Sequence, residues 1–331
     1  MNADTESNPD VARTQSEKLI GSGANLLMGA FDAGSTAAIA QVCEQNKIPL
    51  VVNVGSPMLP PDFKYTFLNF PTVTMLASNG LSLISTMLKA TGVQPKTAVL
   101  FHVNENFGTS MAKEVATLVP QLVPFNIVET TSYAPTVTDL SVEVSKAKAA
   151  KADVQLVITQ LNDAILMVRE MVKQRYEPMG IVSPGSPGMY DNQFFKSLGK
   201  YSEYCISNVP WMDPKREATN ALKASLKKLY PDQPFDANAG FNYDALLVAA
   251  DAHKRAGSTD PQALVNALRS TNLSTGVMIA KGPITFDSTG QNVNLGSATL
   301  QNRDLRPQVV LPEAVAENKV VFPVPGWATR G

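Results

Sequence analysis

Short apolar runs alternate along the chain with longer segments whose apolar residues share one helical face. Residues 24–29 and 48–54 form two such runs, and residues 34–46 between them carry Ile39 and Val42 three positions apart. Short apolar runs bounded by turn residues are typical of buried parallel strands, and a spacing of three or four indicates an amphipathic helix. The pattern therefore predicts a strand–helix–strand unit, which builds parallel sheets.

The same alternation continues through most of the chain. It predicts further strands at 97–103, 127–133, 154–159 and 181–183. It predicts helices at 10–20, 109–122, 138–150, from 162 onward, 218–229, 239–255 and 261–269. Prolines limit helices after residue 282, so the tail is expected to consist of short strands and turns. The fold class is α/β, with parallel sheets covered by helices.

Composition narrows the possible functions. A length of 331 residues suggests two domains, and a net charge of −1 argues against a general nucleic-acid binder. The two cysteines, Cys43 and Cys205, and two histidines, His102 and His253, are too few for a disulfide framework or a structural zinc site. We expect both cysteines to be buried apolar residues and His253 to lie on a helix surface. We expect no metal and no cofactor, because the nucleotide-binding glycine motifs are absent.

Candidate ligand contacts follow the predicted strands, because ligands of open α/β sheets bind at the carboxyl ends of the strands. The segments are Gly34, Ser35 and Thr36 within 32–36, Gly55 and Ser56 within 53–57, Phe107 within 106–108, and Leu161 and Asn162 within 161–163. Free N–H groups at the first turn favour an anion such as a carboxylate. The simpler alternatives are a helix cap for Ser35 or Asn162, a tight turn at Gly55 and a core aromatic at Phe107.

Several motifs in sequence order resemble those of one family. They are NPDVARTQSEKLI, GSTAAIAQVCEQNKIPLV, NFGTSMAKEVA, YAPTVTDLSVEVSKAKAAKADVQLVI, FNYDALLVAADAHKRAGSTDPQALVNALRST and GPITFDSTGQ. Together they resemble the type I periplasmic binding proteins of ABC transporters, in the leucine/isoleucine/valine-binding branch. The resemblance implies two doubly wound parallel-sheet lobes joined by a hinge, which close on one small molecule and deliver it to a membrane permease. It implies a binding protein and no enzyme.

The resemblance also assigns lobes and ligand contacts. It implies a first lobe of 1–70 plus 212–280 and a second of 71–211 plus 281–331. It adds Gly185 and Ser186 to the second-lobe contacts Phe107, Leu161 and Asn162. The family's amino-acid binders usually carry an acid in the 183–188 loop, and this loop has none. That departure favours an aromatic or short aliphatic acid over a branched-chain amino acid, because an unpaired buried ammonium is costly.

A second departure lies at the N-terminus. Family members begin with a strand–helix–strand unit before the segment that matches residues 4–8, so we expect the first strand of lobe 1 to be missing. We then expect weak binding, or association of an otherwise monomeric protein through the exposed strand edge. Equal ligand-dependent melting shifts in this chain and in an N-terminally extended form would contradict this. The resemblance implies a periplasmic location, whereas the sequence as given, with no signal peptide, predicts a cytoplasmic one.

Two other function classes stay open. A ligand-sensing domain of the same fold, for an amide or amino acid, would act without a permease. An enzyme on a doubly wound fold is disfavoured by the scarcity of histidine and by the lack of an obvious carboxylate pair in the strand-end loops.

Overall fold

The computed structural model describes residues 1–30, 32–53, 59, 60, 62–233 and 235–330. Contacts divide the chain into unit 1, Met1–Thr72 with Pro210–Gly296, and unit 2, Val73–Val209 with Ser297–Gly331. Sequence alone predicts 281–296 in the second lobe, and this is wrong: the segment belongs to unit 1. Its Ile284 and Phe286 enter the same apolar core as Phe67 of that unit.

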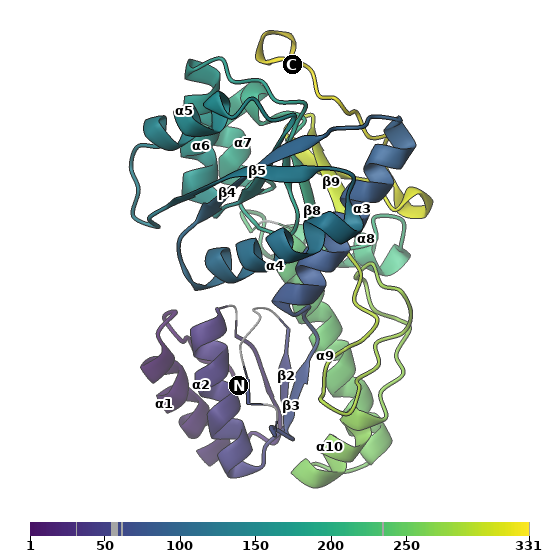
Figure 1. The fold of residues 1–331 in the computed structure, drawn as a ribbon. Coiled ribbons are helices and arrows are strands. Elements are labelled where there is room, and N and C mark those ends of the chain that lie inside the picture. Colours follow the sequence, from purple (N-terminus) through teal and green to yellow (C-terminus); the bar gives the residue numbers. More distant parts are fainter. Residues whose placement is uncertain (31, 54–58, 61, 234, 331) are drawn as a thin grey trace. The chain divides into compact units, whose positions relative to one another are not determined.

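Unit 1 is built on a parallel sheet with the strand order β1 (Leu27–Met28), β2 (Leu50–Val52), β3 (Thr66–Leu68). Helices α1 (Pro9–Gly21) and α2 (Ala33–Asn46) pack on one face, and α9 (Ala237–Ala256) and α10 (Pro261–Arg269) on the other (Figure 1). In the described residues β1 pairs only with β2, so it is an edge strand. That a strand is missing beside it stays a prediction.

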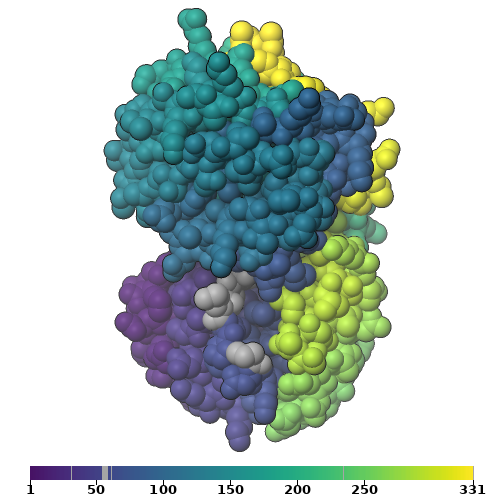
Figure 2. Space-filling view, in the orientation of Figure 1, coloured from purple at the N-terminus to yellow at the C-terminus, as the bar shows by residue number. Residues whose placement is uncertain are grey.

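Residues far apart in sequence therefore share unit 1. In Figure 2 the N-terminal segment, in purple, and the segment that follows residue 237, in green, form two sides of its surface. Helix α8 (Glu217–Leu229) also belongs to this unit and buries only Thr219 among its residues.

Unit 2 contains a larger sheet with the order β10-β9-β8-β7-β6-β4-β5. Its parallel strands are β4 (Thr97–Val103), β5 (Asn126–Tyr133), β6 (Val154–Ile158), β7 (Ile181–Ser183) and β8 (Ile206–Val209). The hairpin of β9 (Ala298–Arg303) and β10 (Arg306–Leu311) joins β8 in antiparallel pairing. This hairpin lies in the tail, for which the sequence predicts short strands and turns.

Helices cover both faces of that sheet. α3 (Val73–Thr91) and α4 (Asn106–Leu122) lie on one face, and α5 (Ser141–Ala149), α6 (Leu161–Lys173) and α7 (Asn192–Leu198) on the other (Figure 1). Short 3₁₀ turns lie at Gly199–Ser202, Glu313–Val315 and Trp327–Thr329. Helices α3 and α7 and strands β3 and β8 are missing from the sequence prediction. In the described residues, no helix combines the length and the apolar composition that crossing a bilayer requires.

The cysteines are buried, as predicted. Burial raises the pKa of Cys43 to about 12 and that of Cys205 to about 11, so neither thiol is reactive near neutral pH. His253 is only half exposed, because its ring contacts the Ala249 carbonyl and the side chain of Asn25. The prediction of a helix-surface histidine is therefore only partly right.

Candidate functional site

The first turn of α2 holds the predicted unit 1 contacts Gly34, Ser35 and Thr36. Asp32 is the helix cap, and its Oδ1 accepts the Ser35 N–H at 2.7 Å. The alternative that Ser35 itself caps the helix is therefore wrong. Gly34 is exposed, whereas Ser35 and Thr36 are fully buried. The Thr36 hydroxyl donates to the Asp32 carbonyl at 2.7 Å, so it serves the turn.

Two buried polar atoms near this turn lack hydrogen-bond partners among the described residues. They are the Ser35 hydroxyl and the carbonyl oxygen Oδ1 of the Asn53 side chain. Asn53 directly follows β2, and its Nδ2 donates to Asn242 Oδ1 on α9. A buried polar atom without a partner costs about 1–3 kcal/mol. The carboxyl ends of β1 and β2 therefore present hydrogen-bonding groups that a ligand could satisfy. Gly55 and Ser56, also predicted here, lie outside the described residues.

In unit 2, the predicted contacts follow three neighbouring strands, β4, β6 and β7. Phe107 comes after β4 and is half-buried in the first turn of α4. Glu105 caps that helix and accepts the N–H groups of Phe107 at 2.9 Å and Gly108 at 2.8 Å. This cap makes α4 start three residues earlier than predicted. Phe107 is therefore held at the strand end and is not a core aromatic.

Leu161 and Asn162 follow β6 in the first turn of α6, half-buried and exposed, respectively. Gln160 precedes the helix as its cap, so the alternative of a cap at Asn162 is wrong. The carboxylate of Asp163 accepts the Gln160 N–H at 3.1 Å and the Tyr133 hydroxyl at 2.6 Å. Burial raises the pKa of Asp163 despite these hydrogen bonds. Burial and the nearby Asp163 raise the pKa of Tyr133 as well.

Gly185 and Ser186 follow β7 and are both buried. The Ser186 hydroxyl contacts the Ser183 hydroxyl at 2.9 Å and accepts the Thr159 N–H at 3.1 Å. The Ser183 hydroxyl also accepts the Ser186 N–H at 2.8 Å. These bonds hold the loop onto the end of β6. Because the Ser186 side chain is buried and already hydrogen-bonded, it is not exposed to a ligand. The Thr159 hydroxyl beside it is buried without a partner among the described residues.

Sequence reasoning missed several acids near the strand ends. Asp32, Glu105 and Asp163 each accept backbone N–H groups at the start of a helix. The signal available for them is a carboxylate one to three residues before or inside a predicted helix start. In the described chain, no three His, Cys, Asp or Glu side chains gather as metal ligands would.

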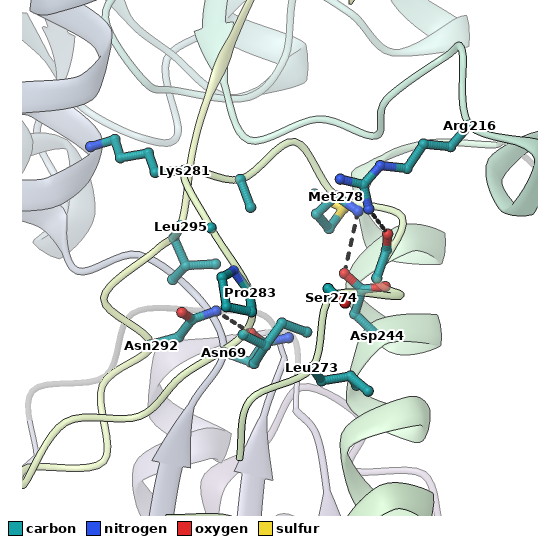
Figure 3. Close-up of a pocket in the computed structure, with 14 residues that line it drawn as sticks. Asn69, Arg216, Asp244, Leu273, Ser274, Met278, Lys281, Pro283, Asn292 and Leu295 are labelled. Carbon is teal, nitrogen blue, oxygen red and sulfur yellow. Dashed lines mark hydrogen bonds between the residues drawn. The ribbon is translucent and has the colours of Figure 1, made fainter. Parts of the chain in front are cut away.

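A cavity of about 300 Å³ lies within unit 1 and shares no lining residue with the α2 turn (Figure 3). Polar walls come from Asn69, which follows β3, from Arg216 before α8, from Asp244 on α9 and from Asn292. Apolar walls come from Leu273, Met278, Pro283, Ile284 and Leu295. None of these residues is among the contacts predicted from the sequence.

The sequence of this chain is similar to those of known proteins. A family model described as periplasmic binding protein matches residues 1–301. A Brucella suis protein named Leu/Ile/Val-binding protein homolog 7 is 25% identical over 236 residues, which is 69% of this chain and 58% of that protein. The chain thus spans less than two thirds of that relative's length.

Two solved structures share the fold. Leucine binding protein LivK from Thermotoga maritima aligns with a TM-score of 0.76 at 18% identity, over 92% of this chain and 85% of that one. The substrate binding protein LivJ from Streptococcus pneumoniae, solved in complex with isoleucine, aligns with a TM-score of 0.77 at 19% identity, over 98% and 87%. At these identities the likeness establishes the α/β fold.

Proposed function

Because this chain belongs to the periplasmic binding protein family, we propose that it is the ligand-binding component of an ABC-type transporter. Its ligand is a small molecule with a carboxylate, and a branched-chain amino acid is the class we favour. Its partner is a membrane permease, its location is outside the cytoplasm, and it acts as a monomer without catalysing a reaction. The relatives named for leucine, isoleucine and valine support this ligand class.

The observation that carries the proposal is the buried hydroxyl of Ser35, which has no hydrogen-bond partner among the described residues. It lies in the first turn of α2, where Gly34 is exposed and the N–H groups of Ser35 and Thr36 are bonded to Asp32. A ligand carboxylate there would accept from the hydroxyl and interact with the helix N-terminus. Asn53 supplies a second atom with no partner in the part of the chain that the structure describes, an acceptor suited to an N–H donor of the ligand.

The acids at the strand ends change the expected ligand. The loop 183–188 lacks an acid, which on sequence grounds favours a ligand without an amine. Asp32, however, places a carboxylate beside the same turn as Ser35, and the Oδ1 of this carboxylate accepts the Ser35 N–H. An ammonium group would be attracted to this carboxylate, so an amino acid is a better match than an amine-free acid. Phe107, Leu161 and Asn162 of unit 2 are proposed as further ligand contacts.

A pair of ligands that differ only in the amine tests this proposal. Calorimetry should show tighter binding of L-leucine than of 4-methylpentanoate. Ser35→Ala should weaken leucine binding about 10- to 100-fold, as the loss of a hydrogen bond to a charged group predicts. Ser225→Ala, at an exposed serine of α8, is the matched control and should leave binding unchanged. If 4-methylpentanoate binds more tightly than L-leucine, the favoured ligand is an acid without an amine. If both serine variants bind leucine equally well, the proposed role of Ser35 is refuted.

A further inference from the structure

The lining of the unit 1 cavity includes the cationic Arg216 and the anionic Asp244, which are not paired with each other. Arg216 and Asp244 both line the cavity (Figure 3), and Gly276 is close to both of them. Among the described residues, no ion pair joins the two side chains within 4.0 Å, although Arg216 is close enough to lower the pKa of Asp244. A cavity of about 300 Å³ is at the lower end of the range for small-molecule sites.

Arg216 is fixed in place, yet one end of its guanidinium is available. Its Nη1 donates to the Gly276 carbonyl, and its Nε lies 3.4 Å from Asp213 Oδ2. Among the described residues, the hydrogen bonds of this guanidinium involve Nε and Nη1 and none involves Nη2. A guanidinium held in this way is well suited to bind a carboxylate, because its planar donors are already oriented.

Asp244 is also fixed, and it is only 2% exposed. Its Oδ1 accepts the Val277 N–H at 2.7 Å, and its Oδ2 accepts the Met278 N–H at 3.3 Å. The approach of the loop is so close that a β-carbon at Gly276 would lie 2.6 Å from Oδ2. Each carboxylate oxygen can accept more than one hydrogen bond, so an ammonium group can still bind there.

The rest of the cavity fits a short apolar chain. Leu273, Ile284 and Leu295 line it, and the Lys281 side chain points away from the other labelled residues in Figure 3. At the far side, Asn292 Nδ2 donates to Asn69 Oδ1 at 2.8 Å, so these two amides satisfy one another. The charged groups are thus confined to the Arg216 and Asp244 end of the cavity.

We propose that this cavity is a second ligand site, which binds a small zwitterion with its carboxylate on Arg216, its ammonium on Asp244 and a short apolar side chain against Leu273, Ile284 and Leu295. The site is separate from the α2 turn and does not depend on the proposed transport function. An α-amino acid with a four- to six-carbon skeleton is the class of ligand that carries all three groups.

Calorimetric stoichiometry of the full chain with L-leucine tests the second site. We expect two leucines per wild-type chain and one in Arg216→Gln, with binding at the α2 turn unchanged. Ala280→Leu, at an exposed residue that lines the cavity, should also leave one. Ala221→Leu on α8 is the matched control and should keep two. Neither cavity variant removes a buried group, so both are expected to fold.

The outcomes separate this proposal from the transport function. In the Ser35→Ala background, leucine should still bind the cavity, whereas 4-methylpentanoate and 3-methylbutylamine, which each lack one charge, should bind at least tenfold more weakly. Suppose that the wild type binds one leucine per chain, that Ser35→Ala abolishes this binding, and that Arg216→Gln and Ala280→Leu leave it unchanged. This result would overturn the second site and leave the proposed function intact. One leucine lost only in the cavity variants would support the second site and contradict the proposed role of Ser35. No leucine binding to the wild type would overturn both.

Discussion

Replacing Asp244 with Asn should change how stability depends on pH. Burial raises the pKa of Asp244 from 3.8 to about 6, although the N–H groups of Val277 and Met278 and the charge of Arg216 oppose the shift. The folded state therefore holds this proton more tightly than the unfolded state does. Stability contributed by the protonated form is present below about pH 4 and is lost as the pH rises through about 6. A shift of about two pK units corresponds to about 3 kcal/mol.

The measurement compares Asp244→Asn with the wild type by guanidinium unfolding between about pH 4 and pH 7. Fluorescence of Trp211, which is buried in unit 1, and far-UV circular dichroism report the transition. The wild type should lose about 3 kcal/mol relative to the Asn variant over this range. Asp232→Asn, at an exposed carboxylate, is the control and should track the wild type. A stability difference between wild type and Asp244→Asn that does not change with pH would refute the reasoning.

Two further substitutions test packing in unit 2. Gly80→Ala should lower the free energy of unfolding by more than about 3 kcal/mol, and with it the melting temperature, because the new β-carbon would overlap the backbone carbonyl of Pro184. An unchanged melting temperature would show that the two segments are not in contact. Tyr133→Phe should cost about 1–3 kcal/mol in urea unfolding, because the buried Asp163 carboxylate loses its 2.6 Å hydrogen bond. A variant as stable as the wild type would mean that another donor replaces the phenol.

The strands and helices that the sequence predicts are those whose apolar residues form a clear pattern along the chain. The run at 97–103 matches β4 at both ends, because its residues are apolar on both faces and are bounded by polar turns. Helix α3 was missed although it buries Leu76, Leu81 and Ile84, because its serines and threonines interrupt the apolar pattern. Strand β9 lies in the tail, where the sequence predicts short strands without bounds, because β9 is buried yet rich in polar residues, among them Gln301, whose amide bonds the Val321 carbonyl.

The sequence predicts where the candidate residues lie in the fold better than it predicts which hydrogen bonds they make. Strand order alone places Ser35, Phe107 and Asn162 at the carboxyl ends of strands, and there the structure has them. Which of these atoms are free depends on contacts that no local pattern encodes. Ser186 illustrates this, because its hydroxyl accepts the N–H of Thr159, which lies 27 positions away in the sequence. The charged pair of the cavity is equally hidden, because Arg216 and Asp244 meet only through the loop that carries Gly276.

The discontinuity of the two units has a consequence during synthesis on the ribosome. Unit 1 needs residues up to Gly296, and unit 2 needs the β9–β10 hairpin that follows Ser297. By the time residues 210–296 emerge, the five parallel strands of unit 2 have already been made, so they can pair first. Meanwhile β1, β2 and β3 wait without α9 and α10 to cover one face. The nascent chain therefore holds an exposed apolar sheet for most of its translation, a state in which a holding chaperone would be useful.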